Sequence, residues 1–210
     1  MGEIATESAD AELNNVVGSF RKDNLSAELH LDLLEALAKR KSNPVIAKSL
    51  SLIEEKRSKD DKLAMWREVL VGGDAEAGRR VFLYKSEVSC LRCHKVQGNG
   101  GEVGPDVTAI GTKQKRDYLL EAIVLPNAQI AKGFDSVTLF LNNGKSVSGV
   151  LKGETDIEVK IVTAEGQPLT IRKADIDERQ VAKSAMPEDV LKYLSKRELR
   201  DLVEFLATVK

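Results

Sequence analysis

The chain has 210 residues, a length that suffices for one large domain or two small ones. Its 32 lysine and arginine residues and 33 aspartate and glutamate residues leave a formal net charge of -1, which excludes an overall electrostatic case for binding nucleic acid or an acidic membrane surface. Aromatic residues make up only 4% of the chain, so its core has room for a bulky group other than an aromatic side chain.

The N-terminal segment is polar and weakly patterned. We expect residues 1–24 to be largely disordered or weakly ordered. The opening sequence MGEIATESADAELNN is acidic and polar, unlike a secretory signal peptide. No stretch of the sequence approaches the roughly 18 consecutive apolar residues that a membrane-spanning helix needs. The sequence therefore predicts no transmembrane segment.

Apolar residues at helical spacing dominate residues 25–73. Ser26 is placed to cap a first amphipathic helix, Pro44 takes the favoured first position of a second, and a third begins near Asp61. Gly73 follows the end of this third helix. We predict a three-helix unit that looks like the end of an array of helical repeats.

The next part of the chain is also predicted to be helical, around a glycine-rich loop. Asp74 can cap a helix that contains Phe82 and leads directly into two cysteines. The glycine-rich loop follows, and its glycines are typical of a loop that lies close to a flat ligand. A further helix starts at Thr112 and stops before Pro126.

From Phe134 the apolar period changes from helical to two, which indicates strands. Asn143-Gly144 is a strong hairpin signal, and the apolar runs around it predict a small antiparallel sheet or barrel at about 134–178. Ser195 is placed to cap a terminal amphipathic helix. The expected fold class is therefore mainly α with a small antiparallel β insertion.

The segment Cys90-Leu91-Arg92-Cys93-His94 matches the attachment sequence of c-type haem. In this motif two thiols add across the vinyl groups of one haem, and the adjacent imidazole is the proximal ligand of the iron. One tight turn presents both sulfurs to one edge of the macrocycle and places the imidazole under the iron. The sequence therefore predicts one covalent haem c, attached through Cys90 and Cys93, with His94 bound to the iron.

Two other interpretations of the cysteines fit the sequence less well. A structural zinc site needs four ligands, whereas the sequence outside the motif offers only His30 and no further cysteine. A thioredoxin-like redox pair needs a strand-to-helix context within a βαβ unit, which the pattern does not show.

Met186 is the candidate for the second axial ligand of the iron. It lies in the segment SAMP, after the expected sheet and before the last helix. A thioether ligand favours ferrous iron and so raises the reduction potential. The alternative is that Met186 is a plain hydrophobic anchor of its loop. Met65 lies at helical spacing from apolar neighbours and is expected to fill the core.

Pro105 is the candidate partner of the proximal histidine. Its carbonyl is placed to accept a hydrogen bond from the Nδ1–H of His94, which would fix the tautomer of the ring and increase its basicity as a ligand. The alternative is that Gly104-Pro105 only makes a turn.

Several of these features together resemble a class I cytochrome c over residues 74–210. A GxxxF segment with Gly78 and Phe82 precedes CxxCH, GPD follows it, and a methionine loop and a closing LVEFL helix complete the pattern. More narrowly, GGDAEAGRRVF, CLRCHKVQGNGGEVGPDVTAIG, YLLEAIVLPNAQIAKGF and SAMP are similar to the haem-binding domain found in planctomycetes and verrucomicrobia. That domain is typically fused behind helical repeats and propeller-like dehydrogenase modules.

The resemblance implies a specific arrangement of the haem domain. The helix of Gly78 and Phe82 would cross the terminal helix of Phe205, with haem between them and Met186 opposite His94. The chain departs from small cytochromes c because Met186 follows His94 by 92 positions, and the β insertion accounts for most of this excess.

The resemblance also implies an electron carrier rather than an enzyme. It would be an exported, periplasmic or extracytoplasmic domain that serves redox partner proteins or a fused dehydrogenase module, and we expect it to be part of a larger protein. One alternative is a gas-binding or sensor haem domain in which Met186 binds the iron weakly or not at all. Another is a peroxidase-like haem, for which only His30 could act as an acid or base.

Overall fold

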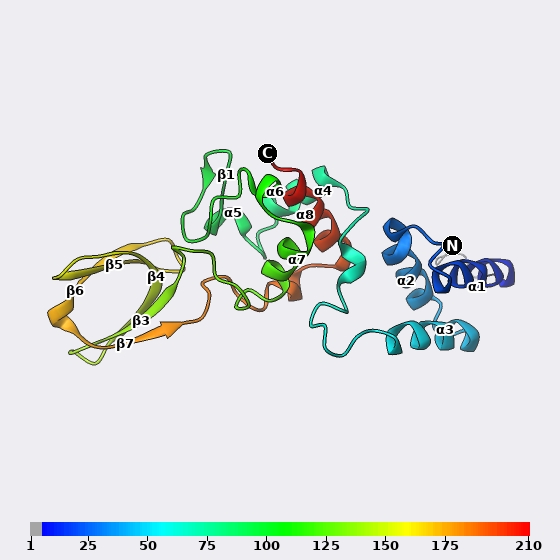
Figure 1. The fold of residues 1–210 in the computed structure, drawn as a ribbon, viewed down its shortest axis with the longest axis horizontal. Coiled ribbons are helices and arrows are strands. Elements are labelled where there is room, and N and C mark those ends of the chain that lie inside the picture. The colour runs from blue at the N-terminus through cyan, green and yellow to red at the C-terminus, as the bar shows by residue number, and fades with distance from the viewer. Residues whose placement is uncertain (1–5) are drawn as a thin grey trace.

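The computed structural model describes residues 6–210. Figure 1 shows three bodies in a row, with N-terminal helices at one end, a central helical body, and a β-sheet at the other end. Among the described residues, 44% are helical and 18% lie in strands. The expectation of a mainly α fold is therefore wrong, because a five-stranded antiparallel sheet and a two-stranded sheet make this a fold that combines helix and sheet.

The N-terminal body contains α1 (Glu7–Arg21), α2 (His30–Lys39) and α3 (Pro44–Glu55). Leu13 and Val17 lie one turn apart on α1 and pack with Leu37 and Ile46 in a separate apolar cluster. The prediction of weak order for residues 1–24 is wrong for α1, because its apolar face has partners that its polar composition does not reveal. Residues 1–5 lie outside the described part of the chain.

Of the next two helices, α3 begins as the sequence predicts and α2 does not. Asn43 caps α3 through its side chain, which accepts from the Val45 N–H, and Pro44 holds the first position as predicted. Ser26 makes no cap hydrogen bond, and the chain passes through a short 3-10 turn, η1 (Ala27–Leu29), before α2 begins.

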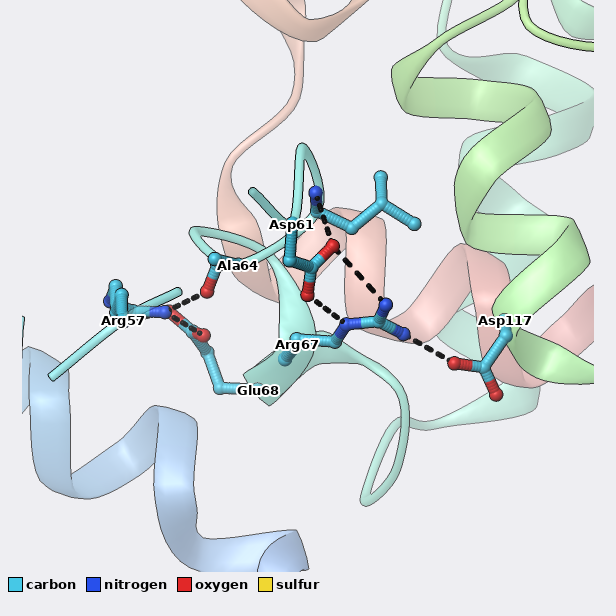
Figure 2. A network of polar contacts seen from close by, with 7 residues as sticks. Arg57, Asp61, Ala64, Arg67, Glu68 and Asp117 are labelled. Carbon is cyan, nitrogen blue, oxygen red and sulfur yellow. Dashed lines mark hydrogen bonds and ion pairs between the residues drawn. The ribbon is translucent and has the colours of Figure 1, made fainter. Parts of the chain in front are cut away.

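The helix predicted from Asp61 does not form. Only a 3-10 turn, η2 (Arg67–Val69), interrupts an irregular segment there. Side chains occupy backbone groups that a helix would pair internally, because Arg57 donates to the carbonyl of Ala64 and Asp61 accepts from the Leu63 N–H. Figure 2 shows these contacts beside the ion pairs of Arg67 with Asp61 and Asp117.

The central body is built on two crossed helices, α4 (Ala75–Tyr84) and α8 (Lys196–Thr208). Asp74 caps α4, and Ser195 opens α8 with a complete capping box, both as predicted. At the crossing, a Cβ added to Gly78 would lie only 1.8 Å from the Asp201 carbonyl oxygen. The crossing that the resemblance implied is confirmed, and Phe82 meets Phe205 with ring centroids 5.6 Å apart.

Shorter elements complete the central body. These are α5 (Cys90–Cys93), a hairpin of β1 (Lys95–Val96) and β2 (Asn99–Gly100), α6 (Ile110–Lys113), α7 (Arg116–Val124) and the 3-10 turn η4 (Val190–Tyr193). The helix expected from Thr112 is divided into α6 and α7, and α7 ends before Pro126 as expected. Helices α6 and α7 both pack against α8.

The sheet contains β3 (Ser136–Leu141), β4 (Ser146–Glu154), β5 (Glu158–Val162), β6 (Pro168–Arg172) and β7 (Ile176–Ala182), with a 3-10 turn, η3 (Lys173–Asp175), before β7. Its order is β6-β5-β4-β3-β7 and every pairing is antiparallel. The antiparallel insertion and the hairpin at Asn143-Gly144 are confirmed. The expected end at 178 falls within β7, which is largely exposed and therefore lacks the apolar alternation of a strand.

Each body has its own apolar interior, and the curved sheet encloses Val137, Leu139, Val159 and Ile161. The central cluster includes Phe82, Leu199, Val203 and Phe205. Of the helices in residues 6–210, none is long and apolar enough to cross a membrane.

Candidate haem-attachment site

The two cysteines of the motif lie on one turn of helix. Cys90 and Cys93 are the first and last residues of α5, so their side chains emerge on the same face. The helix starts abruptly, because Ser89 before it has left-handed backbone angles, φ 47° and ψ 41°. Both cysteines are half-buried and carry free thiols. The motif thus presents two available sulfurs side by side.

His94 is held by the residue that the sequence proposed. His94 Nδ1 donates a hydrogen bond to the carbonyl of Pro105 at 2.9 Å. This contact fixes the tautomer with its proton on Nδ1 and leaves the Nε2 lone pair available to a metal. Burial lowers the pKa of His94, against the opposing effect of the Pro105 hydrogen bond. The ring is therefore favoured in the neutral form, the form in which an imidazole can bind a metal.

Gly104 brings the backbone flat against the imidazole. A Cβ added there would lie 2.5 Å from His94 Cε1, and the Gly104 N–H donates to the Cys93 carbonyl at 2.8 Å. Gly101 packs as closely on the motif, since its added Cβ would lie 1.9 Å from the Arg92 carbonyl oxygen. These glycines were expected to lie against a flat ligand, whereas the structure places them against the motif's own backbone and ring.

The state of the thiols does not favour a redox-active cysteine pair. Burial raises the pKa of Cys90 to about 11, whereas the attacking cysteine of a thioredoxin-like pair needs a lowered pKa. The strand next to α5 is β1, which pairs with β2 in a two-stranded antiparallel hairpin rather than within a βαβ unit.

Metal binding by side chains alone finds no support in the described part of the chain. Residues 6–210 contain no group of three or more His, Cys, Asp and Glu side chains arranged to hold a metal ion. His30 belongs to the N-terminal body, where its Nε2 lies 3.1 Å from the Leu25 carbonyl oxygen and its ring meets Phe20 edge-on. It serves that body's structure and is not part of the cysteine site.

Met186 lies on the same core as the motif. Its half-buried side chain packs against the central cluster, as does the side chain of Cys90. The expectation for Met65 is wrong, because it is 50% exposed in the irregular segment that replaces the predicted helix. Met186 is therefore the methionine that the fold associates with the motif.

These residues fit a covalently attached haem. The two thiols share a face, the imidazole is oriented with Nε2 available, and a thioether packs on the same apolar cluster. An open hollow of about 540 Å³ adjoins this cluster between α4, α8 and β1, and its lining includes Leu83, Val96 and Phe205 as well as charged side chains such as Glu76 and Arg79. The hollow is not lined by the cysteines or by His94, so the case for the site rests on the motif geometry.

The roles of two further residues of this region were not predicted from the sequence. Gly104 was expected to lie close to a flat ligand or to make a turn with Pro105, whereas its lack of a side chain lets the backbone reach the His94 ring. The sequence predicts no role for Asn127, whereas in the structure its side chain hydrogen-bonds to the loop that carries Met186. The available signal was its position directly after Pro126, where an asparagine in a turn often bonds to backbone groups.

Comparison of the chain with protein-family models and with curated protein sequences finds no match.

Proposed function

We propose that this chain is an electron-transfer cytochrome domain with one haem c. Cys90 and Cys93 would hold the haem covalently, and His94 and Met186 would be the two axial ligands of its iron. The observation that carries the proposal is the 2.9 Å hydrogen bond from His94 Nδ1 to the Pro105 carbonyl, next to two free thiols on one helical face. The likeness to the planctomycete and verrucomicrobial haem-binding domain agrees with it.

The haem, when bound, supplies one-electron chemistry at its iron. The chain's own residues orient and tune that group. Pro105 keeps the proton of His94 on Nδ1 and increases the basicity of Nε2, and Gly104 leaves the ring in place. The thioether of Met186 would favour the ferrous state. Covalent attachment through the thiols would retain the haem in both redox states.

An electron carrier accounts for these features better than an enzyme does. A peroxidase-like haem needs an acid or base on the side opposite the proximal histidine. His30, the other histidine of the chain, is engaged in the N-terminal body with Leu25 and Phe20. We therefore propose that the domain passes electrons between redox partner proteins or from a fused dehydrogenase module, in an exported assembly where haem c is attached.

The test is to produce the chain together with a c-type haem maturation system and to measure two properties of the product, covalent haem attachment and the absorption spectrum. Haem should stay attached after denaturation in the wild type and be lost in a Cys90→Ala/Cys93→Ala variant. The ferric protein should show the sulfur-to-iron charge-transfer absorption, and Met186→Ala should abolish it.

Each negative result has a distinct meaning. Failure of covalent attachment in the wild type would overturn the haem proposal. Attachment without the charge-transfer absorption, together with ready uptake of carbon monoxide by the ferrous form, would replace electron transfer by a gas-binding or sensor function. The Met65→Ala variant is the matched control, because Met65 is exposed and should leave the absorption unchanged.

A further inference from the structure

The loop that carries Met186 is held by one side chain from a distant part of the chain. Asn127 Oδ1 accepts a hydrogen bond from the backbone N–H of Ser184 at 2.8 Å, and Asn127 Nδ2 donates to Glu188 Oε1 at 2.5 Å. Inside the loop, Ser184 Oγ accepts from the N–H of Met186 at 3.2 Å. The side-chain amide of Asn127 therefore hydrogen-bonds to the loop both before and after Met186.

Asn127 is itself presented by a rigid turn. The Ala128 N–H donates to the Leu125 carbonyl at 2.8 Å, which closes a turn immediately after α7. Pro126 is buried and occupies the second position of this turn, where its fixed φ suits the conformation. Helix α7 packs on α8 and on η4, the turn that follows the methionine loop. The backbone of Asn127 is thus fixed relative to the central body, and its exposed side chain extends from there to the methionine loop.

The contacts require an asparagine. One amide supplies an acceptor for the Ser184 N–H and a donor for the Glu188 carboxylate. An aspartate would keep the acceptor but would place a second carboxylate against Glu188. The carboxylate of Glu188 also accepts from Lys183 Nζ at 2.9 Å, in a pair whose two side chains are exposed.

We propose that Asn127 is a positioning residue for Met186. Its side-chain amide holds the loop of residues 184–188 in place and so determines how readily the Met186 thioether leaves the haem iron. The inference deepens the proposed function and rests on it for the iron. The claim about the loop stands on the hydrogen bonds alone.

The experiment compares haem-loaded wild type with Asn127→Ala, Asn127→Asp and the double variant Asn127→Asp/Glu188→Gln. The double variant exchanges donor and acceptor and can rebuild the contact in the opposite direction. The matched control is Asn142→Ala, which removes a 2.8 Å side-chain hydrogen bond to the Ala174 carbonyl within the β-sheet body. Two quantities are measured: amide hydrogen exchange at Ser184 and Met186, and the affinity of the ferric iron for added imidazole, which must displace the thioether.

Loss of one hydrogen bond changes an equilibrium by about twofold to tenfold. In Asn127→Ala, both exchange at the two amides and affinity for imidazole should rise by about this factor. Asn127→Asp should change both in the same direction, because repulsion between its carboxylate and Glu188 separates residue 127 from the loop. The double variant should return towards wild type, and Asn142→Ala should change neither quantity.

Unchanged exchange in Asn127→Ala would overturn the inference whatever the haem does. Faster exchange with unchanged imidazole affinity would show a loop anchor without effect on the iron and would overturn the positioning role. A wild type without sulfur ligation would overturn the ligand itself, and the Met186→Ala comparison identifies that failure separately.

Discussion

Gly104 is the residue on which the orientation of His94 depends most directly. The imidazole lies against its backbone so closely that an added Cβ would come within 2.5 Å of Cε1 and 2.8 Å of Nδ1. Because the same imidazole nitrogen donates to the Pro105 carbonyl, any side chain at 104 must push the ring away from that acceptor or distort the loop. The orientation of His94 thus depends on the absence of a side chain at residue 104.

Gly104→Ala should therefore weaken both the fold and the site. We expect the free energy of unfolding in urea to fall by about 1–3 kcal/mol, and the nuclear magnetic resonance signal of the His94 Nδ1–H to shift or vanish. The control is Gly153→Ala, because a Cβ at Gly153 meets nothing within 4 Å. It should change stability by less than about 0.5 kcal/mol. Equal effects of the two substitutions would contradict the role of Gly104.

The residues of the site differ in how far sequence alone could identify them. Cys90, Cys93 and His94 are adjacent and their spacing carries the chemistry, and Pro105 follows closely enough for its hydrogen bond to be predicted correctly. Asn127 contacts residues 57 and 61 positions away, so its place after Pro126 can indicate a turn but not these partners. Met186 was chosen for its place between elements, and its ligation of iron stays a prediction.

At the scale of elements, the crossing of α4 and α8 holds the central body together. Gly78 lets the two helices approach closely, because it has no side chain at the crossing. A Cβ added to Gly78 would lie 1.8 Å from the Asp201 carbonyl oxygen. The Asp74 N–H, at the start of α4, also donates to the Asp201 side chain at 2.8 Å. Phe82 and Phe205 meet on the same pair of helices. The contact is too close for any larger residue.

Two glycines within helices should therefore respond in opposite directions to alanine. Gly78→Ala should lower the free energy of unfolding by about 3 kcal/mol or more, because the helices must separate. Gly18→Ala in α1 meets nothing within 4 Å and should raise it by about 0.5–1 kcal/mol, the helix propensity gain alone. Denaturant unfolding of both variants tests this, and a stabilising Gly78→Ala would show that the crossing is not tight.

Elements were predicted well where the signals are local. The first helical position of Pro44, the caps at Asp74 and Ser195 and the hairpin at Asn143-Gly144 each involve residues within a few positions, and the structure confirms them. The predictions failed where distant partners decide. Helix α1 is ordered by α2 and α3, the segment at 61–70 is bonded by side chains from elsewhere, and β7 exists because β3 pairs with it.

At the scale of the whole molecule, charged contacts join the N-terminal body to the central one. Arg197 and Arg200 of α8 both pair with Asp32 of α2, and Arg197 also pairs with Glu35. Glu68 lies in the segment between the two bodies. Its carboxylate forms an ion pair with Arg57 and a second one with Lys196 Nζ at 2.6 Å. Figure 2 shows the Arg57 half of this arrangement. The side chain of Glu68 is only 4% exposed, so water screens the two ion pairs of Glu68 little.

This arrangement gives the stability of the molecule a specific dependence on pH. Burial acts to raise the pKa of Glu68, but hydrogen bonds from Arg57 and Lys196 outweigh it, and the pKa lies below its ordinary value. A carboxylate with a lowered pKa in the folded state stabilises the fold above its unfolded pKa of about 4.3. That contribution is lost as the pH falls below this value and through the folded pKa.

Glu68→Gln should isolate this contribution from the other carboxylates. At pH 7 the variant should unfold at lower denaturant, with a loss of roughly 1–3 kcal/mol, because two half-buried cationic groups lose their charged partner. The difference from wild type should shrink as the pH is lowered below about 4.3, because protonation removes the same charge from the wild type. Glu12→Gln, an exposed position on α1, should cost less than about 0.5 kcal/mol at either pH. A difference between wild type and Glu68→Gln that is independent of pH would mean that packing, and not charge, joins the two bodies at this residue.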